Sequence, residues 1–550
     1  MNSFSSKDRN QLLSFAKNGK FDLIVIGGGI TGAGIALDAA SRGMKVILVE
    51  KEDFASGTSS KSTKLIHGGL RYLKQLDFKL VREVGQERAI VHRNAPHLVY
   101  PEPMLLPVIK GGSLGKTSTA IALWLYETLA GVRSSEKRKM LSKEATLLLE
   151  PLLNDEILKG AAMYTEYRTD DARLTIEICK TAVSYGAICL NYLQVNEILK
   201  QNEKVIGVSV SDQLNNDKFN LYGTYVINAA GPWVDQLREF DNSRKGKFLH
   251  LTKGIHLVFQ RSRFPLNQAV YFDHLDGRMI FAIPRENSVY IGTTDTNYTG
   301  NKEDLEIAKE EAQYLLNGAN AMFPLLKLQI SDVKSSWAGL RPLIHQEGKS
   351  PSELSRKDEL FISKSGLISI AGGKLTGYRK MAEKSVDFVV KSFKKEFKKD
   401  FGNCKTENIK LSGGDFKGLA ELASYIEQQT GESKQIGGTF QLIRKLVLKY
   451  GKNTEKIVAL AYELWPLRED KECVLQLAEI KYCEENEMVI YPSDFWIRRT
   501  GALYFEKENL NENIEKFKDD FQINKLQTPA ESREMHYLLL KALDNLVNFK

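Results

Sequence analysis

Residues 22–50 constrain the fold most strongly, because they contain every part of a β-α-β nucleotide-binding unit. The apolar run DLIVI is followed by Gly27, Gly29 and Gly32 in a G-x-G-x-x-G turn, and a second apolar run, KVILV, ends at Glu50. These glycines permit a tight turn, close approach of backbone to a pyrophosphate, and packing of helix on strand. Helix N-terminal N–H groups favour phosphate, and Glu50 is placed to accept hydrogen bonds from ribose hydroxyls. The segment therefore predicts a dinucleotide site.

Length, charge and cysteine usage narrow the class of protein. A chain of 550 residues exceeds one hydrophobic core, so roughly three or four domains are expected. The net charge of +8 suits an anionic substrate or lipid surface, or simply a solvated lysine-rich surface. The five cysteines form no C-x-x-C pair, which indicates buried thiols in a reducing compartment and no metal site. Basic stripes interleaved with aromatic residues are absent, so nucleic acid is not an expected partner.

No segment has the pattern of a signal peptide, and no run reaches the roughly 18 apolar residues of a transmembrane helix. The most apolar short segment is residues 119–131, TAIALWLYETLAG. Lys116 precedes it, and basic residues follow it at Arg133, Lys137, Arg138 and Lys139. Such a helix lies either in a lipid interface or buried within the protein.

The pattern of elements changes along the chain. Residues 76–95 and 171–189 predict helices, and the proline-rich residues 96–108 predict an extended crossing into another domain. Short runs between about 250 and 300 predict a mostly antiparallel sheet, followed by a helix at 302–317. Residues beyond about 405 predict a separate helical domain. The strand ending in NAAGPWVD places Ala230 and Gly231 against the cofactor, or is a plain strand-to-helix turn.

Candidate chemical groups come from four separate segments. The stretch 59–73 carries His67, Arg71 and Tyr72, and the later groups are His256, Arg341, Lys374, Thr376 and Arg379. Arginine and lysine gathered from glycine-rich turns suit a small dianion such as a phosphate monoester; singly, each is more often a surface charge or part of a structural ion pair. A histidine suits the role of proton acceptor when hydride leaves an alcohol carbon, although many histidines are structural.

These motifs together resemble a known family. DLIVIGGGITGAGIALDAASRG, TSSKSTKLIHGGLRYL, YRTDDARL, NAAGPWVD, TKGIHLVF, IGTTDT, SSWAGLRPL and AGGKLTGYRKMAE are similar to the FAD-dependent, aerobic, quinone-linked glycerol-3-phosphate dehydrogenases. The resemblance runs from about residue 21 to about 505. The calcium-binding tail of the mitochondrial form of the family and the long insertion of some glycerol-phosphate oxidases are missing.

The resemblance implies an α/β fold with three parts. It comprises a Rossmann-like FAD-binding domain of the glutathione-reductase or D-amino-acid-oxidase type, an antiparallel substrate-capping sheet and a C-terminal α-helical domain. The expected ranges are 21–95, 165–245 and 341–397 for the FAD domain, 96–164 for a cap segment, 246–340 for the capping sheet and 405–550 for the helical domain.

Site residues follow from the same resemblance. Non-covalent FAD is expected on Asp22, Gly27, Gly28, Gly29, Ile30, Thr31, Gly32, Glu50, Ser59, Ser60, Ser62, His67, Gly68, Gly231, Gly372, Gly373, Lys374, Leu375 and Thr376. The expected substrate-binding residues are Arg71, Tyr72, Arg356 and Lys374. His67, His256 and Arg341 are the expected catalytic residues, with the choice of histidine left open.

The implied reaction is oxidation of sn-glycerol 3-phosphate to dihydroxyacetone phosphate, with electrons passed through FAD to membrane quinone. A cytoplasmic protein in peripheral contact with lipid on the inner face of the membrane is expected, and a homodimer is left open. The alternatives are an oxidase that uses O2 and releases peroxide, another amine or hydroxy-acid flavoenzyme, and a non-catalytic flavin-binding regulatory module.

Overall fold

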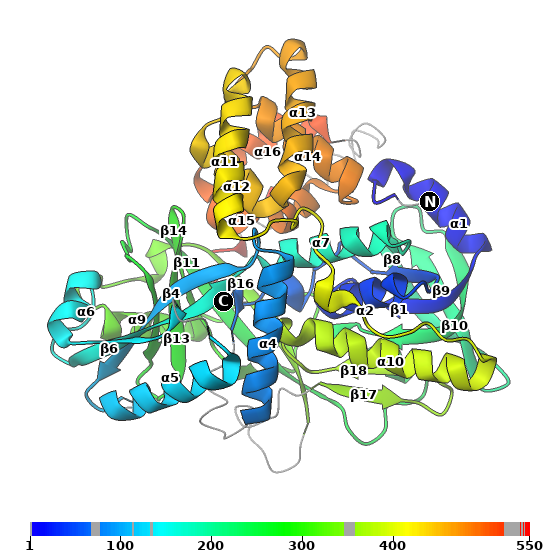
Figure 1. Ribbon diagram of the computed structural model, residues 1–550, viewed down its shortest axis with the longest axis horizontal. Helices are drawn as coiled ribbons and strands as arrows, with labels where there is room; N and C mark the ends of the chain where they lie inside the picture. The colour runs from blue at the N-terminus through cyan, green and yellow to red at the C-terminus, as the bar shows by residue number, and fades with distance from the viewer. Residues whose placement is uncertain are drawn as a thin grey trace.

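The computed structural model describes residues 3–67, 78–112, 115–132, 136–345, 358–521, 539–540, 543 and 545–549. Two large sheets stand side by side beneath a group of helices from the C-terminal part of the chain (Figure 1). One sheet contains the predicted nucleotide-binding unit, and the other contains the antiparallel segments. The α/β fold with a C-terminal helical domain is confirmed.

The nucleotide-binding sheet is built around β1 (Lys20–Ile26), the strand of the DLIVI run. It pairs in parallel with β2 (Val46–Val49) and with β10 (Lys218–Asn228). The sheet continues through β7 (Ile188–Leu190) on one side and through β18 (Ile368–Ala371) and β17 (Glu359–Ile362) on the other. Residues far apart in sequence therefore meet at the carboxyl ends of these strands, where open α/β sheets bind their ligands.

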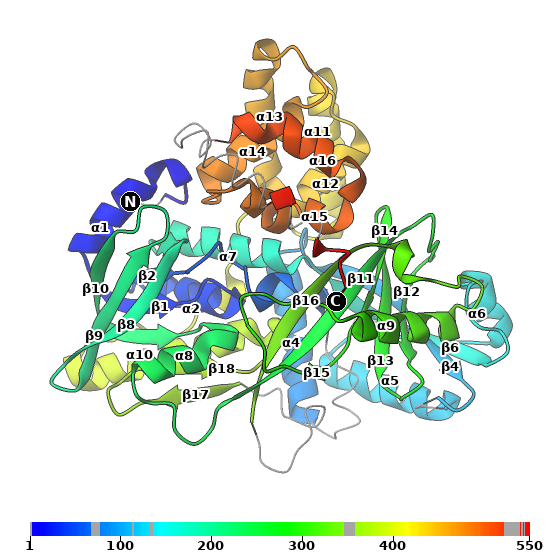
Figure 2. The same ribbon diagram turned by 180° about the vertical axis from the view of Figure 1, so that it is seen from behind.

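Three helices cover one face of this sheet. These are α2 (Ile30–Ser41), α7 (Asp171–Ser184) and α10 (Tyr378–Phe397), which lie side by side (Figure 1). The meander of β8 (Leu193–Gln201), β9 (Lys204–Asp212) and β10 is seen from the opposite side, with α8 (Val234–Phe240) (Figure 2). Gly34 allows α2 to approach α10 closely, because a Cβ there would lie 2.9 Å from Tyr378. Both faces are thus buried, which explains the continuous apolar strands.

The second sheet is a cap made from two stretches of chain. β4 (Tyr100–Ile109) pairs antiparallel with β6 (Leu158–Arg168), so the proline-rich crossing is extended as predicted. β11 (Leu249–Gln260), β12 (Ala269–Asp273), β13 (Met279–Arg285) and β14 (Ser288–Gly292) form the predicted antiparallel sheet. β16 (Val333–Ile344) pairs with β11 along almost its whole length. The short strands of this sheet are β3 (Leu65–Ile66), β5 (Lys139–Leu141) and β15 (Thr296–Asn297).

Helices outside the sheets differ slightly from the predicted ranges. α1 (Arg9–Asn18) precedes β1, α4 (Phe78–Asn94) lies within the predicted 76–95, and α6 (Lys143–Leu149) precedes β6. The helix predicted at 302–317 is α9 (Lys309–Met322). It begins later because Glu311 caps its start by accepting a hydrogen bond from the Ala308 N–H. The expected limits of the cap were residues 164 and 340. β6 and β16 each extend four residues beyond these limits, because their hydrogen-bonded pairing with neighbouring cap strands continues there.

The C-terminal helices rest on the nucleotide-binding sheet through buried ion pairs. They comprise α11 (Leu419–Ser433), α12 (Phe440–Tyr450), α13 (Thr454–Leu464), α14 (Val474–Asn486), a π-helical turn (Asp494–Arg499), α15 (Ala502–Phe505) and α16 (Lys507–Phe517). Arg499 donates to the Asp53 carboxylate at 2.7 and 2.9 Å, and both side chains are fully buried. Arg173 of α7 similarly pairs with Glu487. Since an unpaired buried charge is costly, these contacts fix how the domains dock.

Candidate active site

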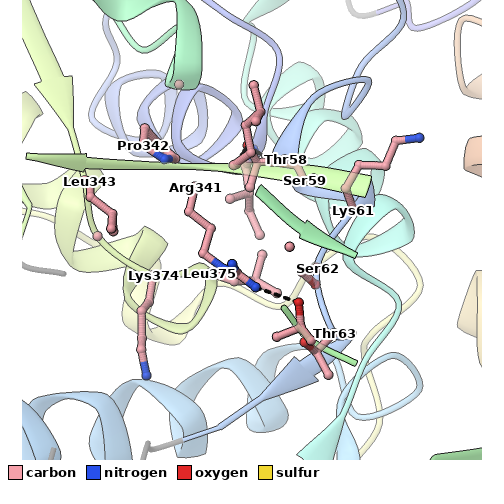
Figure 3. Close-up of a pocket in the computed structure, with 18 of the residues that line it drawn as sticks. Thr58, Ser59, Lys61, Ser62, Thr63, Arg341, Pro342, Leu343, Lys374 and Leu375 are labelled. Carbon is pink, nitrogen blue, oxygen red and sulfur yellow. Dashed lines mark hydrogen bonds between the residues drawn. The ribbon is translucent and has the colours of Figure 1, made fainter. Parts of the chain in front are cut away.

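A cavity of about 1360 Å³ lies between the two sheets and is lined by both. The nucleotide-binding side supplies the β1–α2 turn, residues 56–63 and the turn before α10. The cap supplies residues from β11, β13 and β16. In Figure 3 the Arg341 side chain hangs from β16 into the pocket toward Thr63, whereas that of Lys374 extends away from Arg341.

The glycine turn fits a dinucleotide. Gly27 has φ +109°, and a Cβ there would lie 2.7 Å from the Ala229 carbonyl oxygen. A Cβ on Gly32 would lie 1.9 Å from the Gly27 carbonyl oxygen, closer than atoms can approach. The turn therefore requires glycine at both positions, and it presents the start of α2 to the cavity.

Glu50 at the end of β2 is a buried carboxylate on the cavity wall. Its two oxygens accept hydrogen bonds from the Gly28 N–H at 2.6 Å and the Glu52 N–H at 3.0 Å. Burial raises the pKa of Glu50 to about 7, because desolvation outweighs those two hydrogen bonds. A buried acceptor beside a glycine turn is the feature that a ribose hydroxyl needs, so these residues fit the predicted group.

Most expected cofactor residues line this one cavity. They are Gly27, Gly29, Ile30, Thr31, Glu50, Ser59, Ser62, His67, Gly231, Gly372, Gly373, Lys374, Leu375 and Thr376. Gly28 and Gly32 shape the turn without lining the cavity, and Ser60 is buried behind it. Gly68 lies outside the described residues.

Asp22 is not placed to bind the cofactor, contrary to expectation. It stands near the start of β1, at the opposite end from the glycine turn. Its carboxylate accepts a hydrogen bond from the Lys45 N–H at 2.8 Å and pairs with Lys399 at 3.1 Å. Asp22 therefore fixes the start of β1 against Lys45 and Lys399 and does not contact the cofactor site.

A second glycine turn approaches the cavity from the last part of the nucleotide-binding sheet. Gly372 and Gly373 have φ +78° and +81°, and a Cβ on Gly373 would lie 2.4 Å from the Met381 sulfur. Thr376 follows, and its hydroxyl donates a hydrogen bond to the His67 carbonyl oxygen at 3.4 Å. The turn thus links Thr376 to His67, which belong to two separate segments expected at the cofactor.

Arg341 enters the cavity from β16. Its guanidinium donates hydrogen bonds to the Thr294 carbonyl at 3.0 Å, the Asp295 carboxylate at 3.1 Å and the Thr293 hydroxyl at 2.8 Å. The group packs on Gly254 of β11, where a Cβ would lie 2.2 Å from Nη2. These contacts orient the guanidinium. The side chain remains 20% exposed and lines the cavity, so its positive charge is accessible from the cavity.

His256 lies on the neighbouring strand, β11, and is buried at 1% exposure. Its ring stacks on Trp337 with centroids 4.7 Å apart, and Nε2 is 3.0 Å from the Thr63 hydroxyl. Burial lowers its pKa well below the usual value, and the charges of Arg341 and Lys64 lower it further. The imidazole is therefore neutral at pH 7, with proton-accepting capacity.

The other expected residues have mixed outcomes. His67 lines the cavity and contacts Phe281 edge-on, with ring centroids 5.9 Å apart. Arg71, Tyr72 and Arg356 lie outside the described residues.

Arg379 is not available to an anion, because it is buried and ion-paired with Glu87 and Glu383. It follows the glycine turn by only a few residues, but it points to Glu87 of α4 and does not line the cavity. The sequence pattern alone did not distinguish it from Lys374, which does line the cavity.

Sequence reasoning missed the residues that orient the catalytic candidates. Thr63 contacts His256, and Thr293 and Asp295 hold Arg341. Thr293 and Asp295 belong to the IGTTDT motif, which contributes to the family resemblance but from which no site residue is expected. The available signal was the cluster of hydroxyl and carboxylate groups directly after a buried strand.

The comparisons agree with this geometry. Residues 22–379 match the family model described as FAD dependent oxidoreductase. Residues 404–520 match the model described as the C-terminal domain of alpha-glycerophosphate oxidase.

Similar whole proteins are also found. An aerobic glycerol-3-phosphate dehydrogenase of Bacillus subtilis is 51% identical over 537 residues, covering 97% of this chain and 96% of the relative. One from Staphylococcus haemolyticus is 50% identical, covering 94% and 92%. A solved glycerol-3-phosphate dehydrogenase from Bacillus halodurans, complexed with FAD, is 43% identical with a TM-score of 0.83, covering 99% of both chains. An L-alpha-glycerophosphate oxidase from Mycoplasma pneumoniae, 20% identical with a TM-score of 0.55 and covering 68% and 95%, shares the fold.

Proposed function

The chain belongs to the aerobic glycerol-3-phosphate dehydrogenases of the FAD-dependent oxidoreductase family, and we propose that it oxidises sn-glycerol 3-phosphate to dihydroxyacetone phosphate. The observation that carries the proposal is the meeting of two sites in one cavity. A dinucleotide cradle on one wall faces Arg341 and His256 on the other. A pure flavin-binding module has no need of this second set of groups.

FAD is held, in this proposal, by the glycine turn, Glu50 and the residues around Gly372 and Gly373. When bound, FAD supplies the hydride-accepting chemistry. The backbone at Gly27 and the start of α2 suits its pyrophosphate, and Glu50 suits a ribose. Among the described residues that line the cavity there is no cysteine, and we propose non-covalent attachment.

Arg341 binds and orients the anionic substrate in this proposal and also stabilises negative charge on the reacting oxygen. Lys374 lines the same cavity but extends away from Arg341 (Figure 3), so it stays a proposed substrate contact on the resemblance. Arg341 is pre-oriented by three hydrogen bonds, so little rotamer freedom is lost on binding. Arg71, Tyr72 and Arg356 stay proposed substrate contacts on the resemblance alone. Fixing the substrate beside the reacting group contributes to rate by orientation.

His256 is the proposed proton acceptor. It is neutral and lines the cavity. The positive charge of Arg341 on the adjacent strand contributes to its lowered pKa. A dianionic substrate offsets the positive field of Arg341 and Lys64, which raises the basicity of the imidazole when substrate is bound. His67 is the alternative, because it also lines the cavity.

Anaerobic addition of sn-glycerol 3-phosphate to the FAD-loaded protein tests the proposal. The visible flavin band should bleach, whereas glycerol should reduce it far more slowly. Arg341→Ala should slow reduction by glycerol 3-phosphate at least about 100-fold, since the two charge-assisted hydrogen bonds that a guanidinium can donate to the anionic substrate are lost. Its reaction with glycerol should change little if the lost interaction is with phosphate, and should fall equally if Arg341 acts on the reacting oxygen. His256→Gln should slow reduction more than His67→Gln; the reverse order would reassign the base.

Membrane quinone is the proposed electron acceptor. O2 is the second candidate, favoured by the match of residues 404–520 to the oxidase C-terminal model. Steady oxygen consumption with stoichiometric peroxide and without quinone would identify an oxidase. Turnover that depends on an added quinone would identify the dehydrogenase.

Peripheral contact with lipid is proposed through α5 (Lys116–Ala130). Among the described residues, no helix combines the length and apolarity needed to cross a bilayer. One side of α5 packs inward at Leu123 and Tyr126, and Ile121 lines the cavity, but Trp124 is 55% exposed and does not line it. Of the flanking basic residues, Arg138 pairs with Glu127 and does not face lipid freely. The helix is thus partly buried within the protein and partly exposed, so burial and contact with a lipid interface are both compatible with its position.

Co-sedimentation with anionic vesicles tests this contact. Trp124→Ser should weaken binding by about tenfold, because an exposed aromatic side chain no longer enters the interface. Leu325→Ser, which removes a 77% exposed side chain elsewhere, is the matched control. Equal binding of the two variants would exclude α5 as the contact. A cytoplasmic location at the inner face of the membrane is proposed on the same basis, and a homodimer stays open.

A further inference from the structure

The cavity continues past Glu50, where three side chains from separate segments meet. Lys51 directly follows β2, Trp233 lies in the turn after β10, and Glu303 lies in the loop between β15 and α9. All three line the cavity. The first two belong to the nucleotide-binding sheet, whereas Glu303 belongs to the cap. We call this trio the closure.

Each member of the closure contacts the other two. The Lys51 ammonium is 2.6 Å from both Glu303 carboxylate oxygens. The Trp233 indole N–H donates to Glu303 Oε1 at 2.7 Å. The Lys51 ammonium also lies over the Trp233 ring, 4.2 Å from its centroid. The contacts combine an ion pair, a charge-assisted hydrogen bond and a cation–π interaction on one carboxylate and one ring.

The loop that presents Glu303 is ordered by its own hydrogen bonds. The Tyr298 hydroxyl donates to the Asn301 carbonyl at 2.6 Å, and the Glu303 N–H donates to the Asn301 side chain at 3.0 Å. Lys302 makes a second link to the other sheet, donating to the Pro232 carbonyl at 3.4 Å. Glu303 is therefore held against Trp233 by the loop as well as by its side chain.

Trp233 is also confined from the nucleotide side. A Cβ added at Gly57 would lie 3.1 Å from the indole ring, so Gly57 leaves the ring just enough space. The side chain thus lies between the 56–63 segment, Lys51 and the cap loop, at intermediate exposure. Its position is set by three neighbours, which is more than a surface tryptophan requires.

The position of the closure beside Glu50 indicates which part of a bound dinucleotide it would cover. In a β-α-β dinucleotide site the pyrophosphate lies at the helix start, and the carboxylate ending the second strand binds the adenosine ribose. Lys51 follows that carboxylate, and the Leu193 N–H donates to the Glu50 carbonyl at 2.7 Å. Leu193, Gln194 and Val195 of β8 therefore form the adjoining wall of the cavity.

We propose that Lys51, Trp233 and Glu303 close the adenosine end of the FAD site, so that retention of FAD depends on a carboxylate supplied by the cap. This inference rests on FAD being the ligand of the cavity, as in the proposed function. The closure is a cofactor-holding contact at the end of the cavity marked by Glu50, so we expect it to act on FAD release and not on substrate oxidation.

Release of FAD from the full-length holoprotein tests this role, followed by the rise in flavin fluorescence after dilution. Trp233→Ala should raise the FAD dissociation constant and release rate about tenfold, since packing, hydrogen bond and cation–π contact are all lost. Glu303→Gln keeps an acceptor for the indole but removes the ion pair, and should raise release about threefold. Trp233→Phe keeps the ring and removes the N–H, and should act similarly to Glu303→Gln.

FMN supplies the discriminating control, because it lacks adenosine and does not reach the closure. Binding of FMN should be unchanged in the three variants, and Glu310→Gln, an exposed carboxylate at the start of α9, should release FAD like the wild type. Unchanged FAD release in Trp233→Ala and Glu303→Gln would overturn the proposal, and so would an equal loss of FMN and FAD affinity. Failure of glycerol 3-phosphate to bleach the wild-type flavin would instead refute the proposed function and leave the release result standing.

Discussion

Titration of Glu50 should control how tightly FAD binds. In the structure this carboxyl is buried, and its pKa is raised to about 7 from an ordinary value of 4.5. Ribose hydroxyls that donate to the carboxylate favour its ionised form, so FAD binding should lower this pKa and release a proton. Below pH 7 the free protein must therefore give up a proton before it forms the tight complex.

The magnitude follows from linkage between proton and FAD binding. Below a pKa of about 7, each unit of acidification should raise the FAD dissociation constant up to about tenfold, until the pKa of the complex is reached. Between pH 7 and pH 5 the total is at most about 100-fold, or about 3 kcal/mol. Above pH 7 the dissociation constant should be flat with respect to this group.

The stability of the FAD-free protein should show the opposite trend. A folded-state pKa above the unfolded value contributes stability that is fully present below pH 4.5 and is lost as pH rises through about 7. The free energy of unfolding should therefore fall by up to about 3 kcal/mol across that window. FAD should therefore raise the free energy of unfolding most at the higher pH values, where the FAD-free protein is least stable.

Glu50→Gln is the test, because the amide keeps a hydrogen-bond acceptor but cannot titrate. FAD binding is measured by fluorescence quenching from pH 5.5 to 8.5, and unfolding by denaturant titration of the protein without FAD. The variant should lose both pH dependences. A flat wild-type dissociation constant across this range, or the same slope in wild type and variant, would refute the reasoning.

Two further substitutions test the cradle and the docking of the helical domain. Gly32→Ala should yield protein without bound flavin, because its Cβ would meet the Gly27 carbonyl oxygen at 1.9 Å; flavin absorbance per protein measures this, with Gly431→Ala, where nothing lies within 4 Å, as control. Asp53→Ala should lower the free energy of unfolding by about 3–5 kcal/mol, because Arg498 and the fully buried Arg499 both lose their Asp53 partner and Arg499 keeps only the longer contact with Glu487 at 3.6 Å. Denaturant titration at pH 7 checks the second prediction, and a loss below about 1 kcal/mol would contradict it.

The nucleotide-binding unit was predictable because its signals are local. Strand, glycine turn, helix and Glu50 lie within one short stretch, and each glycine is required by contacts of the turn itself. The antiparallel cap and the helical domain were also predictable in kind, since alternation and helical periodicity are properties of neighbouring residues. Limits such as those of α9 and β16 were not, because caps and ladder partners decide them.

Whether an individual charged side chain lines the cavity or forms a buried ion pair was not predictable from the sequence. Lys374 and Arg379 stand five residues apart in the same motif, yet one lines the cavity and the other is buried against Glu87. Asp22 sits in the strand that leads to the cradle, yet it faces Lys45 and Lys399. Residue type and spacing are the same evidence in each case, so only the packing around each group separates them.

The sequence alone determined the dinucleotide unit, the α/β class and the set of candidate groups, because backbone conformation and burial pattern are encoded over short distances. Tertiary structure alone decided that Arg341 and His256 lie on adjacent cap strands, held by Thr293 and Thr63, opposite the cradle. It also decided that a cap carboxylate, Glu303, meets Trp233. These pairs come from segments up to about 200 residues apart, as with His256 and Thr63 (|i−j| = 193), and their meeting depends on the docking of two sheets and not on any local pattern.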